Sequence, residues 1–364
     1  MGSWLGVCLV TTLIDTSPNQ TRREEPSSAG LEARQLMREL SAFKTARISR
    51  SSWELASTLL PFVTLFAVML FAVDAGYYWA LALAPVTGLL LLRLFIIQHD
   101  CGHGAFLPGR KGNDWVGRAM GVLTLTPYDC WARSHAIHHA STGNLDARGY
   151  GDVDTLTVQE YADSPRLKRW FYRFYRSPAV LLGLGPAYLF LLRHRLPIGL
   201  MKAGWIYWIA AMGTNLVTAI ILGSLVYAFS FATVAVIFLP ALLIAASTGV
   251  WLFYVQHQFE HGHWDKDAEW SFHDAALMGS SHLELPAVLR WFTGNIGIHH
   301  VHHLASRVPF YRLPEVLRTF PELHDLNRFT MRDTFSMMRL ALWDEGQRRL
   351  VSFREAKQLA RASA

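Results

Sequence analysis

Histidines gather in three short groups along the chain. The first is a pair four residues apart, and the other two share an HxxHH spacing. In a helix, positions i, i+3 and i+4 lie on one face, so the imidazoles of each group can reach a single metal ion. A fourth candidate stands alone in the segment QHQFE. The nine candidate ligands are His99, His103, His135, His138, His139, His257, His299, His302 and His303.

The number of these histidines indicates a site for two metal ions. A structural zinc ion is satisfied by four ligands, so nine ligands suggest two metals with open coordination positions. Imidazole is a favoured ligand for iron, zinc and copper. Cys8, Cys101 and Cys130 contain no CxxC spacing, which argues against a cysteine-ligated zinc or an iron–sulfur cluster. A single HxxxH pair is more commonly a pair of satisfied polar residues, but three groups are hard to attribute to chance in an apolar chain.

The composition is that of a membrane protein with an aqueous portion. Of the 364 residues, 51% are hydrophobic and only 17% are charged, which is too apolar for an ordinary soluble protein. The formal net charge of +6 suits contact with anionic lipid headgroups. Basic runs interleaved with a recognisable reading module are absent from the sequence, so nucleic-acid binding is excluded.

Four apolar segments are long enough to cross about 30 Å of hydrocarbon as helices. Short links join the first to the second and the third to the fourth, which predicts an all-α membrane protein with four transmembrane helices in two hairpins. A helical cytoplasmic cap would carry the metal site. The predicted spans are 55–73, 77–97, 205–226 and 231–254.

Basic residues predict the orientation of these spans. Neither hairpin turn contains Lys or Arg, and neither residue type occurs between Lys202 and Lys266. The positive-inside rule then predicts a multi-pass membrane protein with both termini and the central loop in the cytoplasm. All four groups of histidines fall on that same side of the membrane. A metal site requires this agreement, because its ligands must lie within a few ångströms of one another.

Other segments flank the spans. Residues 1–30 are expected to form a flexible tail, 31–313 the membrane domain, and 314–364 a cytoplasmic helical region. The stretch 178–192 is apolar but short and contains Pro186, so we expect it to lie in the membrane interface. Basic and aromatic residues alternate in 166–176, which is typical of an interfacial helix.

The ordered motifs HDCGH, HAIHH, QHQFE and GNIGIHHVHH resemble those of the membrane fatty acid desaturase family, particularly its bacterial acyl-lipid enzymes. The resemblance extends from Ile97 to Leu313. It implies that the nine histidines ligate two iron ions and that dioxygen is a co-substrate, reduced to water with two external electrons. Two vicinal hydrogens would leave a lipid acyl chain, giving a cis double bond.

Histidine ligands commonly donate their second ring N–H to an oriented acceptor. The candidates for this role are Asp100, Asp152, Asp154, Glu260 and Asn295. His300 could replace His299 as a ligand if the local helix shifts register, and His261 is a further candidate. An HPGG motif of the cytochrome b5 type is absent, so electrons are expected from a separate carrier such as a ferredoxin.

Two other interpretations remain open on the sequence alone. A related enzyme with the same metals could hydroxylate or oxidatively decarboxylate an alkyl chain. A histidine-rich metal transporter would require polar residues within its spans, yet the third and fourth predicted spans contain no charged residue.

Overall fold

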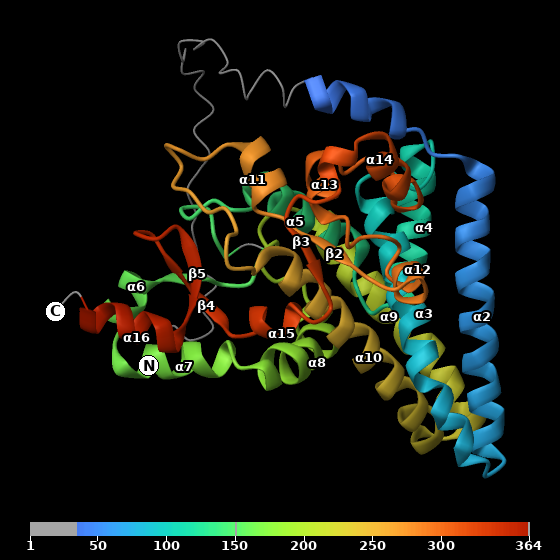
Figure 1. Ribbon diagram of the computed structural model, residues 1–364. Coiled ribbons are helices and arrows are strands. Elements are labelled where there is room, and N and C mark those ends of the chain that lie inside the picture. Colours follow the sequence, from blue (N-terminus) through green and yellow to red (C-terminus); the bar gives the residue numbers. More distant parts are fainter. Residues whose placement is uncertain (1–34, 150, 363–364) are drawn as a thin grey trace.

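The computed structural model describes residues 35–149 and 151–362, so the tail expected at 1–30 lies outside the described residues. Four helices are long enough to cross a membrane. They come together at the lower right of the view, and shorter helices gather around their other ends (Figure 1). The four helices are α2 (Ile48–Asp74), η2 with α3 (Tyr78–Leu83 and Ala84–Gly102), α9 (Trp205–Phe229) and α10 (Phe231–His257).

These four helices confirm the four predicted membrane-crossing segments. They contain 25 to 27 residues each and are apolar enough to cross a membrane. At 1.5 Å per residue, such a helix is about 38 to 40 Å long, which exceeds the hydrocarbon thickness. Much of α9 is exposed in the structure, as expected for a helix surrounded by lipid.

Helix α3 lies at the centre of the long helices and packs most extensively against α10. Gly88 permits this close approach, because a Cβ atom there would lie 2.8 Å from the Ala241 carbonyl oxygen and from the Ile244 Cβ. On its other side α3 contacts α2, where the guanidinium of Arg93 pairs with the carboxylate of Glu54. Both side chains are almost fully buried.

The shorter helices, together with the strands described below, form a region that we call the cap. Those nearest the ends of the long helices are α4 (Arg110–Leu123), α5 (Tyr128–Ser141), α11 (Phe272–Met278), α12 (Ala287–Phe292), α13 (His299–Leu304) and α14 (Leu313–Thr319). The others are η1 (Ser41–Phe43), α6 (Val158–Asp163), α7 (Arg166–Tyr175), η3 (Val180–Leu184), α8 (Gly185–Leu191), η4 (Arg193–Arg195), η5 (Phe310–Arg312), η6 (Pro321–Leu323), α15 (Thr334–Met337) and α16 (Phe353–Ala362).

The cap also contains five short strands, which corrects the all-α expectation. β1 (Leu156–Thr157), β4 (Leu340–Asp344) and β5 (Arg349–Ser352) form one sheet, and β2 (His282–Glu284) pairs in parallel with β3 (Arg328–Thr330). The region 314–364 is therefore not wholly helical, since β3, β4 and β5 lie within it. Strands of two to five residues are too short for a period-two pattern to stand out.

The apolar stretch expected at 178–192 forms two short helices, η3 and α8, which pack against α10. The chain is π-helical at η3, a conformation that is rare and frequently found at functional sites. Large apolar side chains of this region are exposed, among them Leu184 and Tyr188. The preceding helix α7 likewise exposes Leu167 and Trp170 beside its basic residues.

Candidate metal centre

Four helices of the fold deliver the candidate ligands. His99 lies in the last turn of α3, and His103 follows one turn later. The backbone N–H of His103 donates to the backbone carbonyl of His99 at 3.3 Å. His257 is the last residue of α10. Helix α5 supplies the second group of histidines and α13 the third. The long helices and the cap therefore both contribute ligands.

The nine predicted histidines converge into two adjacent groups. In each group the candidate nitrogen atoms lie within 4.8 Å of one another. The first group consists of His99, His103, His135, His139 and His302, and the second of His138, His257, His299 and His303. All nine candidates are brought together, and the described residues contain no further cluster of this kind.

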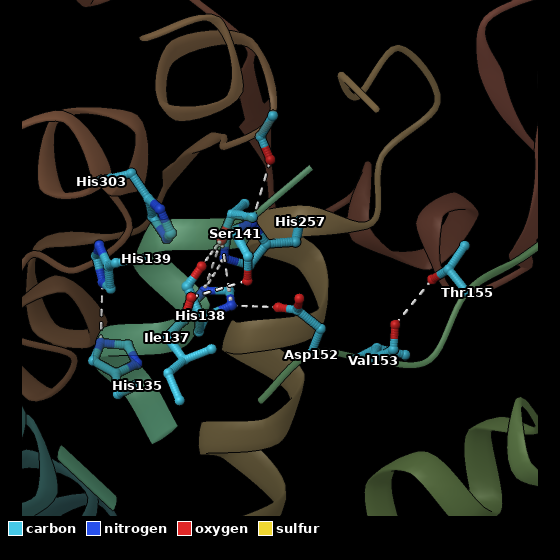
Figure 2. A network of polar contacts seen from close by, with 12 residues as sticks. His135, Ile137, His138, His139, Ser141, Asp152, Val153, Thr155, His257 and His303 are labelled. Atoms are coloured by element: carbon cyan, nitrogen blue, oxygen red, sulfur yellow. Dashed lines mark hydrogen bonds and ion pairs between the residues drawn. The ribbon is translucent and has the colours of Figure 1, made fainter. Parts of the chain in front are cut away.

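The two HxxHH motifs are each divided between the groups, which differs from the expectation of one metal per motif. Successive helical residues are rotated by about 100°, so His138 and His139 point in different directions although both lie on the inner side of α5. Figure 2 shows His139 directed toward His135 and His138 directed toward His257. Helix α13 likewise gives one histidine to the first group and two to the second.

The spacing of the ring nitrogens fits metal ligation. The Nε2 atoms of His299 and His257 are 2.9 Å apart, those of His135 and His139 are 3.1 Å apart, and those of His139 and His302 are 3.2 Å apart. Two imidazoles at right angles around an ion, each bound at about 2.1 Å, place their nitrogens about 3.0 Å apart. These five rings thus have the separation expected of ligands sharing an ion, and the nitrogens of the other four lie within 4.8 Å of those in their own group.

The electrostatics of the site favour neutral imidazoles. Burial, followed by the proximity of other histidines, holds the pKa of His135 and that of His302 well below the usual value. The pKa of His103, of His139, of His299 and of His303 is lowered for the same reasons. A neutral ring offers the free nitrogen lone pair that a metal requires.

Two of the predicted orienting carboxylates contact histidines. Asp152 accepts a hydrogen bond from Nδ1 of His138, whose Nε2 lies 3.2 Å from that of His257 (Figure 2). Asp100 Oδ1 lies 3.2 Å from Nδ1 of His99, and its Oδ2 accepts the Phe310 N–H at 2.7 Å. Each carboxylate can fix the rotation of one ring and leave the other nitrogen free.

The other three candidates have different partners. The carboxylate of Glu260 pairs with Arg349 at 2.9 Å, and the Asn295 amide donates to the Phe310 carbonyl at 3.3 Å. Asp154 is exposed and takes part in the structure through its backbone, whose N–H donates to the Tyr175 hydroxyl. Of the five candidates, only Asp100 and Asp152 contact one of the nine histidines.

A cavity of about 720 Å³ adjoins the histidines. Its walls come from α3, α5, α8 and α10, and they are mostly apolar. His99, His135 and His299 lie at one part of the wall, beside Trp131. The Trp131 and His135 rings stack with centroids 4.5 Å apart and planes 19° apart. The volume lies within the range of about 300–1,000 Å³ common for small-molecule sites.

Comparison with known proteins identifies the family in which these two histidine groups occur. A model of the family described as fatty acid desaturase matches residues 76–335. A protein of Bacillus subtilis named fatty acid desaturase is 38% identical over 326 residues, which are 90% of this chain and 92% of that protein. The chain belongs to the fatty acid desaturase family. Its desaturase domain, as matched, includes all nine histidines.

More distant desaturases of Synechocystis carry more specific names. An sn-1 oleoyl-lipid 12-desaturase is 28% identical over 246 residues, covering 62% of this chain and 64% of that protein. An sn-1 acyl-lipid omega-3 desaturase (ferredoxin) is 27% identical over 236 residues, covering 63% of each chain. This desaturase is accordingly an oxidoreductase of lipid metabolism.

Histidines outside the two groups have other roles in the desaturase fold. Nε2 of His300 lies 2.8 Å from the Leu323 carbonyl oxygen, so His299 and not His300 faces the second group. His261 is exposed, and His263 pairs with Asp265 at 2.7 Å. The cavity walls supplied by 180–200 were not recognised from the sequence. Their one signal was an apolar segment too short to span a membrane.

Proposed function

We propose that the chain is an oxygen-dependent acyl-lipid desaturase, with two iron ions held by the nine histidines. One observation carries the proposal. Three of those histidines, His99, His135 and His299, line a mostly apolar cavity large enough for part of an acyl chain. An apolar cavity that meets a cluster of neutral imidazoles suits a reaction at an unactivated methylene.

The reaction removes two vicinal hydrogens and balances with an external donor. One CH2–CH2 unit, one dioxygen, two electrons and two protons give one cis CH=CH unit and two waters. A pair of iron ions held by these histidines would supply, with dioxygen, an oxidant strong enough for this hydrogen removal. The residues of the chain contribute binding, orientation and exclusion of water.

Individual side chains divide these tasks. The apolar walls hold the acyl chain and keep water from the histidines. Trp131 stacks on His135 and restricts its rotation. Asp152 keeps the His138 proton on Nδ1, which leaves Nε2 directed at the second group.

The proposal includes an orientation in the membrane. The four long helices cross it as two hairpins, α2 with α3 and α9 with α10, and the cap lies in the cytoplasm. In a bacterial cell this is the cytoplasmic membrane. The absence of Lys and Arg between Lys202 and Lys266 supports this orientation. A separate carrier such as a ferredoxin would deliver electrons to the cap, in line with the name of the omega-3 relative.

The test is expression in a host that lacks polyunsaturated lipids, followed by fatty-acid profiling of every lipid class. We expect a new cis double bond, its loss in His138→Ala, and about two irons per purified chain. An unchanged profile in all acyl classes would contradict desaturation. Hydroxylated chains or terminal alkenes would assign the chain to the related hydroxylation or decarboxylation chemistry.

A further inference from the structure

A second wall of the cavity is made by residues of η3, α8 and η4 together with 196–198 and 200, and none of the nine candidate ligands belongs to it. Several apolar side chains of this wall are exposed, including Leu184, Tyr188 and Leu196. Side chains that line a cavity and also face outward mark a place where the cavity opens. The opening is therefore bordered by apolar surface, as expected if it faces the lipid.

Arg193 lies in this same wall and is half-buried. The guanidinium of the neighbouring Arg195 already forms hydrogen bonds, because it donates to Asn215 Oδ1 at 2.8 Å and to the Leu125 and Phe190 carbonyls. The Arg193 guanidinium, by contrast, has no hydrogen bond or ion pair within 35–149 and 151–362. Next to it, the Nδ1 atom of His194 is buried and also lacks a hydrogen-bond partner in that part of the chain.

Carboxylates do not balance this charge. Among the described residues that line the cavity, the only acidic side chain is Asp152, which is engaged by His138. Arg193 is therefore a cation without a partner among the described residues, at a half-buried position of a mostly apolar cavity. A ligand that suits both features carries an anionic group for the guanidinium and an apolar part for the remaining walls.

We propose that Arg193 binds the phosphate of a glycerophospholipid whose acyl chain enters the cavity from the membrane. A guanidinium presents a planar set of donors that matches two phosphate oxygens. The exposed apolar border favours a lipid that enters sideways over a soluble thioester that would enter from water. The inference rests on the proposed function only in that the bound chain is the one desaturated.

Binding to the purified full-length protein tests this without catalysis. Three probes with the same acyl chains are titrated by native mass spectrometry: dimyristoyl phosphatidylglycerol, dimyristoylglycerol and myristic acid. We expect wild type to bind phosphatidylglycerol at least about tenfold more tightly than dimyristoylglycerol, as for a charge-assisted contact. Arg193→Gln should reduce this preference to within about twofold, whereas Arg193→Lys should retain part of it.

Arg332→Gln, at an exposed position of the cap, is the matched control and should bind like wild type. An unchanged preference in Arg193→Gln overturns the proposal, and so does equally tight binding of myristic acid, which would indicate carboxylate recognition. Folding is checked by the thermal unfolding midpoint of each variant, and Arg193→Lys provides the test if Arg193→Gln does not fold.

The binding result separates this proposal from the proposed function. Wild type that selects phosphatidylglycerol through Arg193 but forms no unsaturated product would contradict desaturation and leave the phosphate site standing. If the wild type desaturates lipids and Arg193→Gln leaves the preference for phosphatidylglycerol unchanged, the proposed function is supported and the phosphate site is overturned.

Discussion

Asp152 offers a direct test of how the second group of histidines is oriented. Its side chain is only 10% exposed, and its carboxylate accepts the hydrogen bond of His138 Nδ1. Asp152→Asn keeps the size and an acceptor oxygen but removes the charge, whereas Asp152→Ala removes the contact altogether. We expect both variants to hold metal less tightly, and the alanine variant to be the more affected.

The magnitude follows from the type of hydrogen bond. A bond to a charged acceptor contributes about 2 kcal/mol and a neutral bond about 1 kcal/mol. Losing the charge alone therefore costs about 1 kcal/mol, or about fivefold in metal affinity, and losing the bond costs about 2 kcal/mol, or about thirtyfold. The larger value lies within the 10- to 100-fold range found for residues that orient ligands.

Competition with an iron chelator measures this affinity on purified protein. Asp154→Asn is the matched control, because Asp154 lies in the same loop but is exposed and contacts the fold through its backbone. Equal iron retention in Asp152→Ala and wild type would refute the proposed orientation. Equal losses in Asp152→Asn and Asp154→Asn would show that the loop, and not the carboxylate, matters.

Three further outcomes are expected. Glu54→Gln removes the carboxylate that balances the charge of buried Arg93. The free energy of unfolding should fall by about 3–5 kcal/mol, and the thermal midpoint in detergent should fall with it, whereas Glu322→Gln at the surface should change neither. Gly249 and Leu92 both line the cavity, and a Cβ atom at position 249 would already lie 3.4 Å from Leu92 Cδ1. The larger side chain of Gly249→Leu should therefore narrow the cavity and shift the products to shorter chains at unchanged iron content. Chelation should lower the unfolding midpoint of wild type, because bound ions stabilise only the folded chain, and should lower that of His138→Ala less; an equal fall would argue against ligation by that histidine.

The long helices could be predicted from hydropathy, but the ends that carry the histidines could not. The second predicted span stopped at 97, where polar residues begin, whereas α3 continues to Gly102. Its last turn is polar in sequence yet buried, because the cap covers His99 and Asp100. The strands were missed for a different reason. β1 has only two residues and pairs with β4, nearly two hundred residues later, so no local pattern marks it.

The convergence of the histidine groups could be predicted from residue type and spacing, because i, i+3 and i+4 positions must share a helix face. Their division between two groups could not, since it depends on how α5 and α13 are rotated toward each other. Asp152 and Asp154 looked equivalent in sequence, and only the path of the loop determines which one reaches His138. The sequence also does not show that Arg195, and not Arg193, forms hydrogen bonds within the described part of the chain.

His257 is joined covalently to the wall of the cavity, because α10 lines it from Leu242 to Gln256 and ends at the next residue. Fourteen helical steps correspond to about 21 Å. In the proposed reaction, the place where a double bond forms is measured against this stretch of helix. Regioselectivity is then a property of the polypeptide, and it does not vary with the thickness of the bilayer around it.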